Sequence, residues 1–243
     1  MSTTAFQRAR SEAQRLERRE AILAAAVELL RERSVAELSL NELARRVGLA
    51  KSNVLRYFES REDVLLQVYD REYRAWLEVF DARLVEGGIR GIEAFSELLA
   101  ATVAERPMLS ELSASAAGVL ERNVSGEVAA AYKRAAIANA VRLAELEARH
   151  VAPLTEAAAI SFVGATNLAI GGIWAATQPS PGMAAAYDAH PELHSLRHDY
   201  RVALREFVAT LLTGLAHREP ALPFVAGPYR LTPEPPSTPI PSA

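Results

Sequence analysis

The chain has 243 residues, of which 50% are hydrophobic and 23% charged, the balance of a soluble globular protein with a sizeable core. Cysteine is absent, which excludes disulfides, thiolate metal sites and cysteine nucleophiles and agrees with a reducing compartment. The net charge of −3 hides an asymmetry: residues 1–62 hold 12 Lys and Arg against 9 Asp and Glu, and the remainder holds 15 against 21. A basic end on an acidic body favours a module that binds polyanions.

The N-terminal segment over residues 1–11 is polar and basic and lacks the apolar stretch of a signal peptide, so we expect a disordered basic leader there. From about residue 12 to residue 33, apolar side chains recur at helical spacing and predict the first helix. The residues of this predicted apolar face are Leu16, Ile22, Leu23, Ala26, Val27, Leu29 and Leu30.

Two short helices joined by a tight turn are predicted next. Ser39 and Glu42 have the spacing of a capping box, which predicts a helix from about residue 40 to residue 47. Gly48 ends this helix, because glycine adopts the positive φ of a tight turn at little cost. A third helix is expected over residues 51–57.

The remainder of the chain is also predicted to be helical. Ser60, followed by Asp63, opens a long helix to about residue 85, and three glycines at 87, 88 and 91 mark a boundary after it. Five further helices are expected at about 92–105, 108–121, 126–150, 154–177 and 195–217. Residues 178–191, with three prolines, are predicted to form a loop, and residues 219–243, with eight prolines, an extended tail.

The two short helices have the pattern of a helix-turn-helix. Ala44 is small enough for the next helix to cross closely, and Leu49 fills the corner between the two helices. The residues expected to hold this unit together are Leu40, Leu43, Ala44, Val47, Leu49, Val54 and Phe58. A polar and basic second helix suits the major groove of DNA. Its outward or rim residues are expected to be Lys51, Ser52, Asn53, Leu55, Arg56 and Tyr57.

At these positions the sequence resembles the tetracycline-repressor (TetR) family over about residues 18–66. The residues that carry the resemblance are Ser39, Leu43-Ala44, Val47-Gly48-Leu49, Val54, Tyr57-Phe58 and Arg61-Glu62. The chain departs from the family pattern at Ala50, where a serine is usual, and at Leu55, where a tyrosine is usual. The resemblance implies an all-α regulator with a helix-turn-helix domain over residues 12–60 and a helical ligand-binding and dimerisation domain over residues 61–218.

The resemblance and the side-chain chemistry together assign roles on DNA. Contacts to the phosphate backbone are expected from Ser39, Arg46, Tyr57 and Arg61. Contacts to base edges are expected from Lys51, Ser52, Asn53 and Arg56, because lysine and arginine suit guanine and asparagine suits adenine. The alternative for each residue is a solvated helix face. Arg8, Arg10 and Arg15 are candidates for an adjacent groove or phosphate, or belong to a flexible leader.

The helix at 154–177 is apolar on several sides, and no charged residue lies between Ala157 and Tyr187. Polar residues and glycines within it favour a buried helix over a membrane span. Together with the helix at 195–217 it is expected to form the four-helix interface of a homodimer, as in the family. The alternative is burial of both helices within one chain.

A small-molecule effector is implied by the family, and the sequence places sparse polar groups among apolar helices. A pocket of this composition suits an apolar or aromatic ligand, and satisfied core packing is the alternative. The candidate ligand-binding residues are Trp76, Phe80, Phe95, Ser113, Tyr132, Asn139, Asn167 and Trp174.

A different class of function depends on His190, His194 and His198, which recur every four residues and suggest a metal sensor or an enzyme. The alternative without a functional site is a polar junction between a loop and a helix. The sequence contains no phosphate-binding loop, nucleophile elbow or His-Glu-x-x-His motif. We therefore predict a cytoplasmic, non-enzymatic repressor without a cofactor, whose partners are operator DNA, a small effector and a second copy of the chain.

Overall fold

The computed structural model describes residues 3–218, and every regular element in this range is a helix. The N-terminal elements are α1 (Thr3–Glu32), α2 (Leu40–Arg46) and α3 (Lys51–Val54). The others are α4 (Arg61–Glu86), α5 (Ile92–Ala104), α6 (Pro107–Ala116), η1 (Leu120–Arg122), α7 (Gly126–His150), α8 (Glu156–Thr177), α9 (Pro181–Ala189), η2 (Pro191–Leu196) and α10 (Tyr200–His217). The predicted all-α fold is confirmed.

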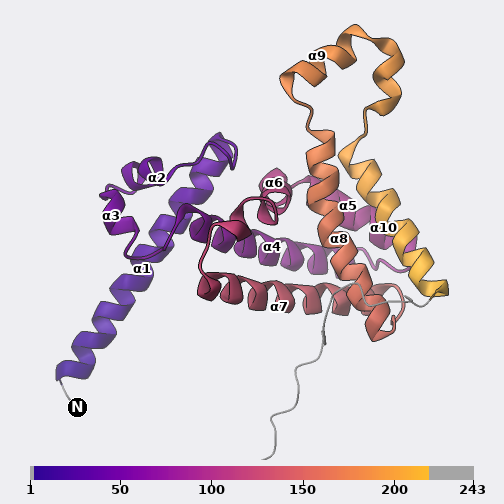
Figure 1. Cartoon of the computed structure of the whole chain (residues 1–243). Coiled ribbons are helices and arrows are strands. Elements are labelled where there is room, and N and C mark those ends of the chain that lie inside the picture. Colours follow the sequence, from indigo (N-terminus) through magenta and orange to yellow (C-terminus); the bar gives the residue numbers. More distant parts are fainter. Residues whose placement is uncertain (1–2, 219–243) are drawn as a thin grey trace, which may run out of the picture.

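The helices form two regions that share α4. Figure 1 shows α1, α2 and α3 at one end of the molecule, α4 and α7 side by side in the middle, and α8 paired with α10 at the other end. One apolar core runs through both regions. It extends from Leu43 and Phe58 in the N-terminal helices, through Trp76 of α4, to Phe162 of α8.

Sequence-based predictions at the first helix need two corrections. Helix α1 begins at Thr3, so the expected disordered leader is helical over most of its length. The physical reason is that no glycine or proline occurs before Ser34, and the segment is rich in strong helix formers. In addition, Leu16 is 62% exposed, and burial on α1 begins at Ile22.

Two further boundaries differ in the C-terminal region. The helix expected over 108–121 ends at Ala116 and is followed by the short η1, because Gly118 disfavours its continuation. The segment expected to be a loop contains α9 and η2. Ser180 caps α9 by accepting a hydrogen bond from the backbone N–H of Met183, and Pro181 occupies its first turn. The proline-rich tail predicted over 219–243 lies outside the described residues.

Helix α8 passes through the middle of the C-terminal region. Within residues 3–218 it is the helix that is long and apolar enough to cross a membrane by length and composition alone. More than half of its most apolar stretch is buried, and it packs against α6, α7 and α10. Gly171 allows the close approach to α6, because a Cβ atom there would lie 2.8 Å from the backbone of Ser113 and Ala114. These contacts are those of a core helix.

Glu147, near the end of α7, has a buried carboxyl group with few hydrogen-bonding partners. The residue is only 1% exposed, and no described side chain forms a hydrogen bond to either carboxylate oxygen. Burial raises the pKa of Glu147 to about 7, and the backbone N–H of Ala152 lowers it only in part. The folded protein therefore binds a proton that the unfolded chain has already released at neutral pH.

The pH dependence of stability follows from this shift. The folded pKa of Glu147 is raised above its unfolded value, so its contribution to stability is fully present below about pH 4.5 and is lost as pH rises through 7. We expect Glu147→Gln to raise the free energy of unfolding at pH 8 by on the order of 2 kcal/mol and to flatten its fall between pH 5 and 7. Chemical denaturation of both proteins at several pH values measures this. An identical pH dependence in the two proteins would contradict it.

Candidate nucleic-acid interface and interior cavity

The helix-turn-helix is held by caps, a glycine turn and buried anchors. The Ser39 hydroxyl accepts a hydrogen bond from the Glu42 backbone N–H at 3.3 Å. Gly48 has a φ of +66°, and the Leu49 N–H donates to the Ala44 carbonyl at 2.9 Å across the turn. The predicted anchors Leu43, Ala44, Val54 and Phe58 are buried, and Leu40, Val47 and Leu49 are packed against them. These contacts fix the crossing of α2 and α3.

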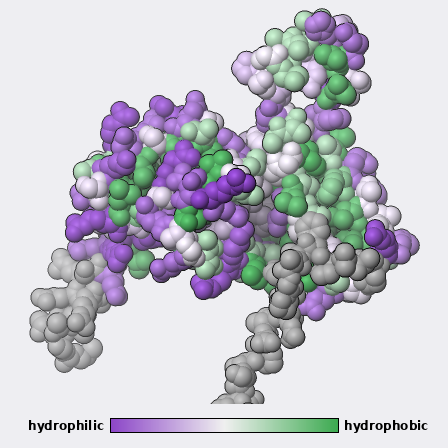
Figure 2. Space-filling model, viewed as in Figure 1, coloured by the Kyte–Doolittle hydropathy of each residue, from purple (hydrophilic) through white to green (hydrophobic). Residues whose placement is uncertain are grey.

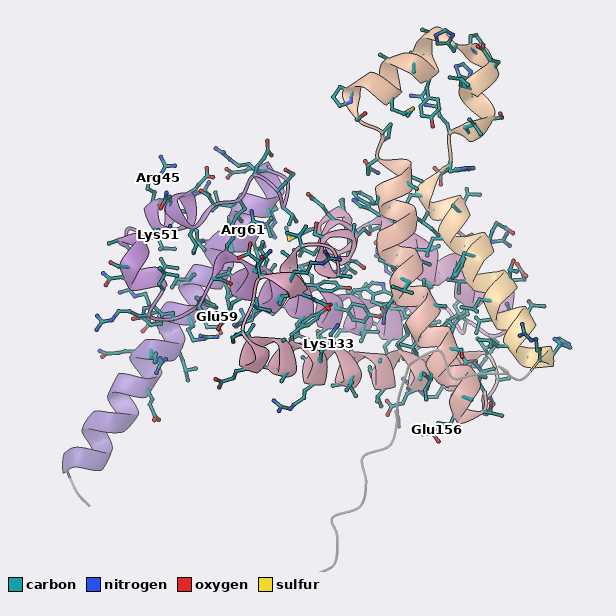
Figure 3. All side chains as sticks on the ribbon, in the orientation of Figure 1. Arg45, Lys51, Glu59, Arg61, Lys133 and Glu156 are labelled. Carbon is teal, nitrogen blue, oxygen red and sulfur yellow. The ribbon has the colours of Figure 1, made fainter. Side chains whose placement is uncertain are left out.

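The outward face of α3 carries the residues expected to read DNA. Lys51, Ser52, Asn53 and Arg56 are exposed, and Leu55, at the unusual position, is 42% exposed. Regular helical bonding ends at Val54, and residues 55–57 continue as a turn. Ala50 precedes the helix without a side-chain cap. In Figure 3, Lys51 and Arg45 lie on the side of α2 and α3 away from the C-terminal helices.

The arginines of this region divide into paired and unpaired groups. Arg46 pairs with Glu32 of α1 at 2.8 Å, and this contact raises the pKa of the guanidinium and lowers that of the carboxyl. Arg61 donates to the carbonyls of Ala36 and Leu38 at 3.3 and 3.1 Å. Both residues are expected on the phosphate backbone, and in the structure each also has an internal partner.

Arg45 is the residue that the sequence analysis missed. It is exposed, and no ion pair or side-chain hydrogen bond to it is found within residues 12–218. Its exposure could have been predicted from the sequence, because Arg45 lies four residues after Asn41, on the side of α2 away from the buried Leu43 and Ala44. Arg45 therefore extends the basic surface of α3 onto α2.

Arg19 joins three elements behind this surface. Its guanidinium lies 4.3 Å from the centre of the Phe58 ring, donates to the carbonyl of Tyr57, and donates to the Gln67 side chain at 2.8 Å. The first two contacts are to the turn after α3, and the third is to α4. The orientation of α3 is thereby tied to α4.

Two carboxylates link the N-terminal helices to the C-terminal helices. Glu111 of α6 accepts a hydrogen bond from the backbone N–H of Val35 at 2.7 Å. Glu59 accepts one from the backbone N–H of Ser125, the cap of α7, at 2.6 Å, and this bond and the Ser125 hydroxyl lower the pKa of the Glu59 carboxyl. Figure 3 shows Glu59 where the two regions meet.

A cavity of about 260 Å³, partly open to solvent, lies between α4, α6, α7 and α8. Its wall is aromatic and polar: the rings of Tyr69 and Tyr132 are 6.2 Å apart, and the Tyr73 hydroxyl donates to the Asn167 side chain at 2.6 Å. Burial raises the pKa of all three tyrosines, so their hydroxyls stay protonated. The residues with polar groups in this wall are Tyr69, Tyr73, Ser113, Tyr132, Asn139 and Asn167, together with the charged Asp70, Glu121 and Lys133.

Two family models match the chain over nearly all of the described range. The model described as "Bacterial regulatory proteins, tetR family" matches residues 22–68, and that described as "Tetracyclin repressor-like, C-terminal domain" matches residues 70–219. The chain belongs to the TetR family. It is therefore a DNA-binding transcriptional regulator with a helical ligand-binding domain, and proteins of this family are generally not enzymes.

No curated protein matches this TetR-family regulator. Among solved structures it is similar to the fatty acid degradation regulator FadR from Bacillus halodurans, with 16% sequence identity and a TM-score of 0.51. The match covers 81% of this chain and 98% of that one. At this identity the likeness extends to the fold alone.

The candidate ligand-binding residues of the TetR-family chain fall into two groups. Ser113, Tyr132, Asn139 and Asn167 line the cavity. The other four do not, and their packing explains why. They are the fully buried Trp76, Phe80 and Phe95, and Trp174, whose ring packs edge-on against Tyr200 at 5.1 Å. Trp76 stacks on Phe80 at 5.5 Å, and Phe80 meets Phe95 edge-on at 5.2 Å.

Tyr69 and Tyr73 were not among the candidates although both line the cavity. Four residues apart on α4, they share a helix face with Trp76, and the sequence signal was the hydroxyl groups they add to that apolar stripe. A cavity needs such polar groups at its wall, whereas large apolar rings fill space completely.

The histidine cluster does not form a metal site in the described part of the TetR-family chain, where no group of three or more His, Cys, Asp or Glu is placed to hold a metal ion. His194 contacts the Tyr187 carbonyl at 2.8 Å and His190 lies 3.4 Å from Glu192. These contacts are within the α9–η2 segment, so the histidines are exposed residues of a polar junction.

Arg45 and Arg61 should respond oppositely to substitution. We expect Arg45→Ala to weaken DNA binding by about 1 kcal/mol and to leave the melting temperature unchanged, because its guanidinium has no internal partner. Arg61→Ala removes two hydrogen bonds to backbone carbonyls and should lower stability by about 1 kcal/mol. Thermal unfolding and a DNA titration on both variants measure this, and a lower melting temperature for Arg45→Ala would contradict the assignment.

Proposed function

We propose that this regulator binds its operator as a homodimer and represses transcription until a small aromatic molecule enters the cavity. The single observation that carries the DNA-reading part is the exposure of Lys51 and Asn53 on α3 and of Arg56 in the turn after it, in front of a buried and capped scaffold. We expect Lys51 and Arg56 to contact guanine, Asn53 to contact adenine, and Ser52 to contact either. Ser39, Tyr57 and Arg45 are expected to contact phosphates. We expect a cytoplasmic location, as for other bacterial regulators of this family.

A homodimer through α8 and α10 is supported by exposed apolar residues on these two helices. Leu168 of α8 is 64% exposed, and Val202 and Phe207 of α10 are 57% and 40% exposed. Figure 2 shows hydrophobic residues gathered on this part of the surface. Gly172 of α8 is also exposed and would allow two helices to approach closely. A symmetric pair presents two α3 helices to successive turns of the major groove, about 34–36 Å apart.

The effector proposal is supported by two helices, α6 and α7, which line the cavity and also contact the N-terminal region. Helix α6 supplies Ser113 to the cavity wall and Glu111 to the contact with Val35. Helix α7 supplies Tyr132 to the wall, and its cap Ser125 contacts Glu59. An occupant that moves α6 would change the contact between Glu111 and Val35, and one that moves the start of α7 would change the contact between Ser125 and Glu59. Either change would alter the position of the helix-turn-helix.

The chemistry of the cavity favours a small aromatic effector with hydrogen-bonding groups. Its volume of about 260 Å³ is below the roughly 300–1,000 Å³ of pockets for drug-sized ligands. Tyrosine rings offer stacking, and tyrosine hydroxyls and asparagine amides offer hydrogen bonds. A long acyl chain, which likeness to a fatty acid degradation regulator would suggest, needs a longer and more apolar channel.

The DNA-reading role is tested with Asn53→Ala. We expect the variant to lose about ten- to a hundredfold in affinity for an operator selected from random DNA, because one bidentate base contact contributes about 1–3 kcal/mol. Helical content should not change, since the side chain is exposed. Asn123→Ala, which removes an exposed amide distant in sequence from α3, is the control. Equal binding of Asn53→Ala and wild type in a gel shift would refute the assignment.

The effector role is tested at Ser113. A thermal-shift screen should find small substituted aromatics that raise the melting temperature. At a ligand concentration of a hundred times the dissociation constant, the free energy of unfolding should rise by about 2.7 kcal/mol. Such compounds should also release operator DNA. We expect Ser113→Phe, which fills the cavity, to abolish the shift, and Ser113→Ala, which leaves it open, to retain it. A screen in which only long-chain fatty acids stabilise the protein would overturn the proposed ligand class.

A further inference from the structure

Helix α1 extends well beyond the core of the helix-turn-helix. From residue 12 onward its first buried residue is Ile22, and every side chain from Glu12 to Arg18 is exposed. With a rise of about 1.5 Å per residue, the part of the helix before Ile22 projects roughly 28 Å. Figure 1 shows this half of α1 standing free of all other helices on the side of α3. Packing within the chain therefore does not account for it.

A groove of about 890 Å³ separates this extension from the turn that follows α3. Helix α1 lines it with Gln14, Arg15, Glu17 and Arg18, and the turn lines it with Arg56 and Tyr57. Three guanidiniums therefore face one carboxylate, which leaves the groove positive. Arg15 and Arg18 are three residues apart, so they lie on the same side of the helix.

The three arginines of the groove have no partner among the side chains that the structure describes. For Arg15, Arg18 and Arg56, no ion pair or side-chain hydrogen bond is found within residues 12–218. Other arginines of the same region are occupied: Arg31 lies against Glu28 and Arg71 pairs with Glu20 at 2.6 Å. With Arg56 assigned to a base edge, the guanidiniums of Arg15 and Arg18 and the phenol hydroxyl of Tyr57 match the charge and hydrogen-bonding groups of a phosphodiester.

We propose that this groove between α1 and the α3 turn binds the DNA phosphate backbone beside the major groove that α3 enters. This inference rests on the proposed mode of operator binding, in which the outward face of α3 lies against base edges. The major groove is about 12 Å wide and is bordered by phosphates, so residues at the end of α3 lie at that border. The α1 extension then continues along the DNA flanking the site and enlarges the contact without reading sequence.

The test compares salt dependence in two double variants that lose the same charge. Arg15→Ala/Arg18→Ala removes two phosphate contacts of the groove. Because each phosphate contact contributes about 0.9 to the slope of log affinity against log salt concentration, the slope should become shallower by about 1.8 per protomer. Arg31→Ala/Arg71→Ala, whose guanidiniums are paired with carboxylates, is the matched control and should keep the wild-type slope. Glu17→Gln should tighten binding at about 50 mM salt and less at about 200 mM.

Two duplexes are used: an operator selected by the protein from random DNA, and an unrelated sequence. A backbone contact must change the slope on both duplexes and leave the preference between them intact. An unchanged slope, a slope shared with the control variant, or a collapse of sequence preference overturns the proposal. If the wild type selects no operator, the proposed function fails, and the slope on the unrelated duplex still decides the role of the groove. Circular dichroism confirms that each variant remains folded.

Discussion

Helix α4 belongs to both regions of the molecule and to the single core that runs through them, and the rest of the structure depends on this constraint. Its N-terminal turn is capped by Ser60 and lies behind the turn after α3, where Arg19 connects it to Phe58. One to three turns further on, Tyr69 and Tyr73 form part of the cavity wall. In the proposed response to an effector, a change at the cavity wall would be carried toward the DNA-binding helices as a movement of α4. The contacts of Glu111 and Glu59 connect α6 and α7 to the same region.

Internal pairing decides which cations face DNA. Arg46 and Arg61 lie close to Arg45 and Lys51 in the sequence. Arg46 is already paired with the Glu32 carboxylate, and Arg61 already donates to two backbone carbonyls. A guanidinium with a good internal partner must lose that partner before it binds a phosphate, and so contributes less to affinity than a free one. In the proposed mode of DNA binding, Arg46 and Arg61 would therefore contribute less than Arg45 and Lys51, and the basic surface would continue along α1.

The predictions from sequence succeeded where the signal is local. The caps at Ser39 and Ser60, the positive φ of Gly48 and the buried anchors Val54 and Phe58 each follow from chemistry within a few residues. The predictions failed where the outcome depends on contacts between distant residues. A stripe of aromatic residues on a helix does not reveal which rings pack together, and only the tyrosines among them reached the cavity.

The sequence by itself determined the helical class, the helix-turn-helix and the family, because periodicity, capping residues and turn glycines act over short stretches of chain. Tertiary structure alone decided which arginines are free, which polar side chains surround the cavity, and how far α1 stands beyond the core. The physical reason is that pairing and burial depend on which helices lie side by side. Arg15 and Arg56, 41 positions apart in the sequence, line one groove because α1 passes beside the turn after α3.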